Sequence, residues 1–236
     1  MCGNSGLGID AHSVREEVQV YAFLFSLRTS SHPLLASISA FTMTANEAYQ
    51  ITSAGTLTLN HLGDLPIPGP KEVLVRLAAF SLNYRDKLVI DHSPDYPLRT
   101  SPNLIPGSDG AGTIESAGSS SRWKKGDRVV IHPSTWLHGV DGADWKFEET
   151  MGGGTFDGTF RRWMVVSDEH LIHAPAGLSL EEAAGMFTAG ATAYRALFHG
   201  GVELKPGVTV LTQGTGGVSS YGILVSLQNA PSRLSQ

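Results

Sequence analysis

The chain has 236 residues, with 17 Lys and Arg against 22 Asp and Glu, so its formal net charge is −5 with histidine neutral. Its 41% hydrophobic content, 27 glycines and 12 prolines are typical of a turn-rich globular protein and exclude a disordered tail, a collagen or a coiled coil. This length accommodates one large domain or two small ones. Adjacent basic residues occur in no block longer than a pair, so nucleic acid is not expected as a partner.

The single cysteine, Cys2, lies at the start of the chain. One thiol builds neither a disulfide framework nor a cysteine-rich zinc site, which favours a cytoplasmic protein, although a mitochondrial location stays open. No apolar run approaches the roughly 18–20 residues of a membrane-spanning helix, so a membrane is not expected as a partner. The apolar stretch 20–27 follows acidic residues and lacks a small-residue cleavage site, which disfavours a secretory signal.

Residues 1–42 show no sustained strand or helix period and are treated as a leader of unknown structure. From Met43 onward, short segments separated by Gly, Pro and Asp predict a series of strands. Such a series predicts a compact, partly open β-barrel as a first domain over 43–175. The expected strands are 48–52, 56–61, 72–80, 112–116, 127–133 and 160–167.

The pattern changes at Ser179. This serine and Glu182, three residues later, form a capping-box signature, and apolar residues then recur at helical spacing as far as Gly200. One continuous helix is therefore expected there. The β-branched segment 208–212 predicts a buried strand, so 176–236 is interpreted as the beginning of an α/β domain.

A glycine-rich motif follows the expected strand directly. Gly214 permits a tight turn, Gly216 allows the backbone to approach a pyrophosphate, and Ser219 is small enough for close helix packing. The helix that opens next would direct its unpaired N–H groups toward the anion. The alternative is an ordinary turn. The expected cofactor-binding residues of the motif are Gly214, Thr215, Gly216, Gly217, Val218 and Ser219.

Five blocks in one order make the sequence resemble the medium-chain dehydrogenase/reductase superfamily, in particular its zinc-independent, quinone-oxidoreductase-like alcohol dehydrogenases. The resemblance implies a mixed fold, with a β-rich GroES-like catalytic domain followed by the start of a Rossmann cofactor domain. It also implies NADP or NAD as cofactor and hydride transfer to or from an alcohol, carbonyl, enone or quinone. The blocks are 81–86, 105–112, 126–129, 192–194 and 214–219.

The resemblance also bears on metal binding. Zinc-dependent members hold their catalytic metal with a Cys, a His and a second Cys, and the matching positions here carry Asn83, Ser108 and Thr188. None of these is a usual zinc ligand, so no zinc is expected. The spacing of His170 and His173 does not favour a metal site either, because Pro175 and Gly177 argue against a helix there.

Within the resemblance, Tyr84 and Asn83 would line the cleft between the domains as catalytic residues, with the Tyr hydroxyl bonding a carbonyl oxygen. Their alternative role is to order the turn before a short helix at 85–90, with Asp86 paired to Arg85 or to a backbone donor. Thr192 would lie against the nicotinamide. Its alternative role is a helix hydroxyl bonded to the carbonyl one turn earlier. His132 and His138 are expected near the cleft or, more simply, in surface or core roles.

The end of the sequence departs from the family. Residues 208–236 are fewer than the roughly 30 or more of one βαβ unit, and the acidic ribose ligand, about 20 residues beyond the motif, would fall past Gln236. The choice between NAD and NADP is therefore not readable, and the chain is expected to be truncated, leaving Val208, Val210 and Leu211 without partners. An inactive fragment or interaction module is the alternative to an enzyme. A small-molecule substrate is expected, and the resemblance allows a homodimer.

Overall fold

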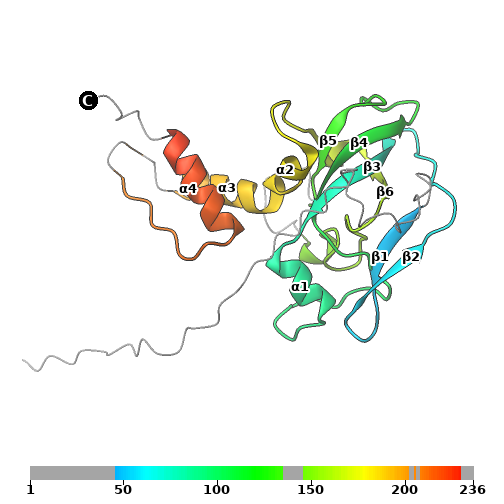
Figure 1. Cartoon of the computed structure of the whole chain (residues 1–236), viewed down its shortest axis with the longest axis horizontal. Coiled ribbons are helices and arrows are strands. Elements are labelled where there is room, and N and C mark those ends of the chain that lie inside the picture. The colour runs from blue at the N-terminus through cyan, green and yellow to red at the C-terminus, as the bar shows by residue number, and fades with distance from the viewer. Residues whose placement is uncertain (1–45, 135–145, 202–204, 206–207, 230–236) are drawn as a thin grey trace, which may run out of the picture.

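The computed structural model describes residues 46–134, 146–201, 205 and 208–229 (Figure 1). The proposed leader 1–42 and His138 lie outside these residues. Two antiparallel sheets dominate, one of two strands and one of five in the order β6-β3-β4-β5-β7. The strands are β1 (Glu47–Ile51), β2 (Leu57–His61), β3 (Glu72–Ser81), β4 (Asp109–Ala117), β5 (Arg128–Ile131), β6 (Trp163–Ser167) and β7 (Leu171–His173).

The six strands expected between residues 48 and 167 are all present, with shifted ends. The five-stranded sheet is open, with β6 and β7 at its edges, which agrees with a partly open barrel. Its core follows the two-residue period of a strand, because Val73, Val75 and Leu77 of β3 are all buried. Each such side chain contributes roughly 1.5–3 kcal/mol on burial. The cluster comprises Val73, Val75, Leu77, Ile114, Trp123, Val129, Ile131, Met151, Met164, Val166 and Leu171.

The central pair β3–β4 is irregular at two places. Its register shifts between Leu74 and Val75 and again between Leu77 and Ala79. At its end, Ser81 of β3 faces Asp109 of β4. This end of the sheet leads to helix α1 (Tyr84–Ile90), and it is here that the polar residues gather.

The single helix expected after Ser179 is three segments: α2 (Leu180–Ala184), a π-helical turn (Met186–Ala191) and α3 (Thr192–His199). The capping box is confirmed, since Ser179 Oγ accepts from the Glu182 N–H at 3.1 Å and the Glu182 carboxylate accepts from the Ser179 N–H at 2.8 Å. The prediction of one continuous helix was wrong, because the backbone N–H of Thr188 donates to the Asp109 carboxylate on β4.

The predicted strand 208–212 is also wrong: these residues are irregular. A strand needs a neighbour for its backbone groups, and the described part of the chain places none beside this segment. As expected for apolar residues without partners, Val208 and Leu211 are 47% and 86% exposed. Helix α4 (Gly217–Asn229) follows the glycine motif and packs against α3 (Figure 1).

Two short 3₁₀ helices, Phe147–Glu149 and Asp168–His170, complete the described elements. Among the residues placed by the structure, no helix combines the length and apolar character needed to cross a membrane.

Candidate functional site

Four polar residues from three separate segments meet at the end of β3 and β4. Asn83 is the N-cap of α1, Ser108 immediately precedes β4, Asp109 is the first residue of β4, and Thr188 belongs to the π-helical turn. Ser108 and Asp109 are buried, whereas Asn83 and Thr188 are partly exposed. We refer to these four residues as the Asp109 network.

The hydrogen bonds of the network converge on the carboxylate. The side-chain amide of Asn83 donates to Asp109 Oδ2 at 3.0 Å and to Ser108 Oγ at 3.2 Å. The hydroxyl and the backbone N–H of Thr188 both donate to Asp109 Oδ1, at 2.5 and 3.2 Å. The hydroxyls of Thr188 and Ser108 lie 3.3 Å apart.

Burial raises the pKa of Asp109 above its usual range, while the hydrogen bonds from Thr188 and Asn83 oppose the rise. A second buried carboxyl, Asp86, lies close by in α1. Burial raises its pKa to about 6, and the positive charge of Arg85 opposes the rise. Two carboxyls therefore share a region where water is scarce, with Arg85 as the neighbouring cation.

Asp86 makes both of the contacts that the sequence analysis considered for it, with Arg85 and with a backbone donor. Its Oδ2 accepts from the backbone N–H of Asn83 at 2.8 Å, and its Oδ1 lies 3.5 Å from Arg85 Nη2. Arg85 also donates to the carbonyl of Met151 at 2.9 Å. These bonds fix the start of α1 and hence the position of Asn83.

Unlike Asn83, neither Tyr84 nor Thr192 is one of the four residues of the Asp109 network. The Tyr84 side chain is 57% exposed, so its ring lies outside the buried part of the network. The Thr192 hydroxyl donates to the Thr188 carbonyl at 2.6 Å, which is the helix-hydroxyl arrangement considered for it. The structure thus brings Asn83 into the network and leaves Tyr84 at its edge.

The glycine motif has the conformation of a tight turn running into a helix. Gly214 has a φ of +78°, a backbone conformation that favours glycine, and α4 begins at Gly217. Ser219 Oγ donates to the carbonyl of Gln213 at 2.8 Å and so ties the helix to the turn. At Gly216 an added Cβ would meet no atom within 4 Å, so the space beside it is open.

Two residues of this region were not identified from the sequence. Asp109 lies beside the position of a metal ligand in the family, which was the available signal. Tyr221 of α4 packs its ring against Gly190, 3.4 Å from where a Cβ would be. Burial raises the pKa of the Tyr221 hydroxyl, and the charge of Asp109 adds to the rise.

The histidines near the sheet make packing and backbone contacts. The ring of His132 packs against Phe187, with centroids 4.4 Å apart, and burial lowers its pKa. His170 Nδ1 contacts the carbonyl of His132 at 3.1 Å, and His173 packs against Trp123. Within the described residues, no three His, Cys, Asp or Glu side chains form a group able to hold a metal.

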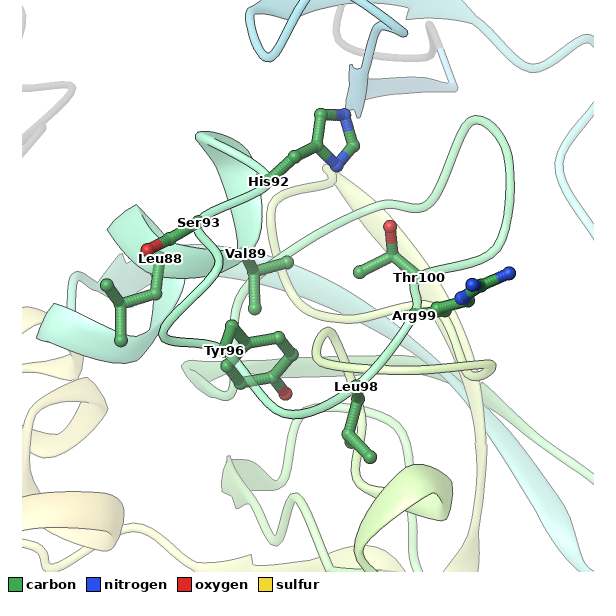
Figure 2. Close-up of a pocket in the computed structure, with 8 residues that line it drawn as sticks. All are labelled: Leu88, Val89, His92, Ser93, Tyr96, Leu98, Arg99 and Thr100. Carbon is green, nitrogen blue, oxygen red and sulfur yellow. The ribbon is translucent and has the colours of Figure 1, made fainter.

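A cavity of about 330 Å³ lies beside α1 and contains none of the network residues (Figure 2). Its lining combines aliphatic groups and the Tyr96 ring with a few polar side chains. The Tyr96 hydroxyl is bonded to the carbonyl of Gly153 at 2.5 Å. The lining residues are Leu88, Val89, His92, Ser93, Tyr96, Leu98, Arg99 and Thr100.

Comparisons with known proteins point to one family. Residues 69–176 match the alcohol dehydrogenase GroES-like domain. A zinc-type alcohol dehydrogenase-like protein of Schizosaccharomyces pombe is 43% identical over 162 residues, covering 67% of this chain and 45% of that protein. A crotonyl-CoA reductase of Streptomyces avermitilis is 32% identical over 231 residues, covering 83% of this chain and 51% of that protein.

Solved structures similar to this chain come from the same family. A Sinorhizobium meliloti 1021 protein classed as an alcohol dehydrogenase superposes with a TM-score of 0.68 at 30% identity, covering 78% of this chain and 55% of that chain. A quinone oxidoreductase of Pseudomonas syringae superposes with a TM-score of 0.56 at 26% identity, covering 75% of this chain and 48% of that chain. The chain belongs to the medium-chain dehydrogenase/reductase superfamily. It spans about half the length of the curated relatives that it matches.

The family's three zinc-ligand positions do converge in this medium-chain dehydrogenase/reductase, but their chemistry does not fit a zinc ion. Asn83 turns N–H donors toward the centre, and an amide N–H cannot ligate a metal. Ser108 and Thr188 carry neutral hydroxyls, whereas zinc sites use thiolate, imidazole or carboxylate. The Asp109 carboxylate is already bonded to Asn83 and Thr188.

A dinucleotide fits the glycine motif better. The open space at Gly216 admits a ligand close to the backbone, and the first N–H groups of α4 lie next to it. The start of α4 also touches the π-helical turn, because an added Cβ on Gly217 would lie 3.0 Å from the Ala189 Cβ. The residues that fit the pyrophosphate are therefore close to those of the Asp109 network.

Proposed function

We propose that this chain forms part of a zinc-independent, NAD(P)-dependent oxidoreductase acting on an alcohol, carbonyl, enone or quinone. The observation that carries the proposal is the Asp109 network, in which hydrogen-bond donors fill the place of a metal at the junction with the glycine motif. A bound nicotinamide would supply hydride transfer. The relatives include alcohol dehydrogenases and crotonyl-CoA reductases, which supports a carbonyl or enone substrate.

In this proposal, separate residues bind the cofactor and the substrate. The N–H groups at the start of α4, with Gly214 and Gly216, bind the pyrophosphate. Asn83, which is held by its bonds to Asp109 and Ser108, lines the substrate site beside Tyr84. Tyr84, next to it and exposed, is the residue free to donate a hydrogen bond to the substrate oxygen as negative charge develops there.

The remaining features of the proposal follow from the same family. The substrate is a small molecule and the cofactor is NADP or NAD. The resemblance to the full-length proteins of the family allows a homodimer. We propose a cytoplasmic location on the basis of cysteine usage, since Cys2 is the only thiol.

Nucleotide binding tests the proposal directly. The purified protein is titrated with NADPH and with NADH while nicotinamide fluorescence is followed. We expect saturable binding, and a rise in Kd of at least about tenfold in Gly216→Leu, because the new side chain enters the space beside the pyrophosphate. Gly177→Leu is the matched control. Neither glycine has a positive φ, and an added Cβ at either meets no atom within 4 Å, so both variants can fold.

A specific observation favours a second candidate, a non-catalytic module of the same family. The described part of the cofactor half contains α4 but no strand, and Leu211 and Leu227 are 86% and 68% exposed. A wild-type protein that binds neither nucleotide, together with a Gly216→Leu variant indistinguishable from it, would support this candidate and contradict the enzyme.

A further inference from the structure

One carboxylate joins the sheet to the segment that precedes the glycine motif. Asp109 Oδ1, on β4, accepts both the backbone N–H and the hydroxyl of Thr188, which lies 79 residues later. Asp109 is 1% exposed, and hydrogen bonds to a buried ionised group are among the stronger ones in proteins. The third residue of the π-helical turn is thus held at two atoms.

The π-helical turn also packs against the glycine motif and the start of α4. Ala189 lies against Gly217, where an added Cβ would be 3.0 Å from the Ala189 Cβ. Gly190 lies against the ring of Tyr221, one turn into α4. In Figure 1, α3 and α4 lie side by side beyond this turn, away from the sheet. Thr188 is therefore the hydrogen-bonded link between Asp109 and the residues that contact the start of α4.

We propose that Asp109 is a positioning residue: through its two bonds to Thr188 it fixes the π-helical turn against which the start of α4 packs. The proposal rests on the proposed function in that the glycine motif is taken to bind the nucleotide. Asp109 touches neither nucleotide nor substrate in this role. Its effect on the nucleotide passes through Thr188, Ala189 and Gly217.

Three variants separate this role from a general contribution to stability. Thr188→Val removes the hydroxyl bond and keeps the shape, and Thr188→Ser restores the hydroxyl. Thr159→Val is the matched control, because the fully buried Thr159 hydroxyl donates at 2.9 Å to the backbone carbonyl of the same Asp109, and not to its carboxylate.

Hydrogen exchange of the backbone amides provides a readout that needs no ligand. We expect Thr188→Val to speed exchange about tenfold in 186–191 and in 217–221, and Thr188→Ser to return it to within about twofold of wild type. Thr159→Val should lower the melting temperature while leaving exchange in these two segments unchanged. Equal exchange in Thr188→Val and Thr159→Val would overturn the proposal.

Nucleotide affinity then tests the link to function. In a wild type that binds NADPH, Thr188→Val should raise Kd roughly tenfold, with rescue by Thr188→Ser. An unchanged Kd beside faster exchange would overturn the positioning role. A wild type that binds no nucleotide would overturn the proposed function alone, because the exchange experiment still decides whether Asp109 holds α4.

Discussion

The backbone N–H of Asn83 donates to the carboxylate of Asp86 at 2.8 Å, inside a region where Asp86 is fully buried. This bond caps α1 with a group whose ionisation is costly. Burial raises the pKa of Asp86 from 3.8 to about 6. The ionisation of Asp86 should therefore make the stability of the protein depend on pH.

The sign follows from proton uptake. Between pH 4 and 6 the folded protein keeps the Asp86 proton and the unfolded chain has lost it, so the free energy of unfolding falls as pH rises and the stabilisation is gone above pH 6. Asp86→Asn should remove this fall in the free energy of unfolding, because asparagine does not ionise. Relative to wild type, the variant's free energy of unfolding should increase by roughly 2–3 kcal/mol from pH 4 to pH 7. Urea unfolding across this range measures it, and a difference that stays constant with pH would contradict it.

The convergence of Asn83, Ser108 and Thr188 predicts that a metal site can be restored. Their side-chain atoms lie 3.2 and 3.3 Å apart, close to the spacing of about 3.3–3.8 Å between ligands of a tetrahedral zinc ion. The variant with Asn83→Cys, Ser108→His and Thr188→Cys should bind one Co²⁺ with the visible absorption of a tetrahedral thiolate site. Asn83→Cys alone, with two ligands missing, should show no such absorption. A spectrally silent triple variant that is folded by circular dichroism would count against this geometry.

Tyr84→Phe tests the proposed donor. The side chain is 57% exposed, so removal of its hydroxyl should leave stability within about 0.5 kcal/mol of wild type. If its hydroxyl stabilises charge on the substrate oxygen, kcat for NADPH-dependent carbonyl reduction should fall roughly 10–100-fold with little change in KM. Tyr194→Phe, at a side chain 51% exposed on α3, is the control and should retain wild-type kcat. Equal rates in both variants would exclude the role for Tyr84.

Gly112→Ala should destabilise the sheet. An added Cβ would lie 2.3 Å from the carbonyl oxygen of Arg76, a backbone atom that cannot move without disturbing the β3–β4 pair. We expect a loss of roughly 1–3 kcal/mol in the free energy of unfolding. Gly177→Ala, in open space, should be neutral or slightly stabilising. Thermal and urea unfolding of the two variants gives the comparison.

The parts of the fold that depend on local pattern were predictable. Alternation along β3 and the Ser179–Glu182 capping box are encoded within a few residues, and both are present. The π-helical turn was not predictable in this way, because it depends on a bond between Thr188 and a residue 79 positions earlier. The strand expected at 208–212 failed for a similar reason, since β-branched residues form a strand only beside a partner.

The candidate site shows the same division. The glycine turn and the helix after it could be located from residue type, and Gly214 has the positive φ that its place in the turn requires. The role of Asp109 could not, because its importance comes from burial and from donors on two other segments. The roles of Tyr84 and Thr192 remain predictions.

The two irregularities in the β3–β4 pair cancel each other. The first leaves Glu115 of β4 without an opposite residue and the second does the same for Ala78 of β3, so that the alignment at Ser81 and Asp109 matches the alignment at Val73 and Ala117. Because neighbouring side chains on a strand point to opposite faces, losing just one irregularity would turn Asp109 away from Thr188. A one-residue deletion in either strand would therefore dismantle the polar cluster even where the hydrophobic core could still assemble.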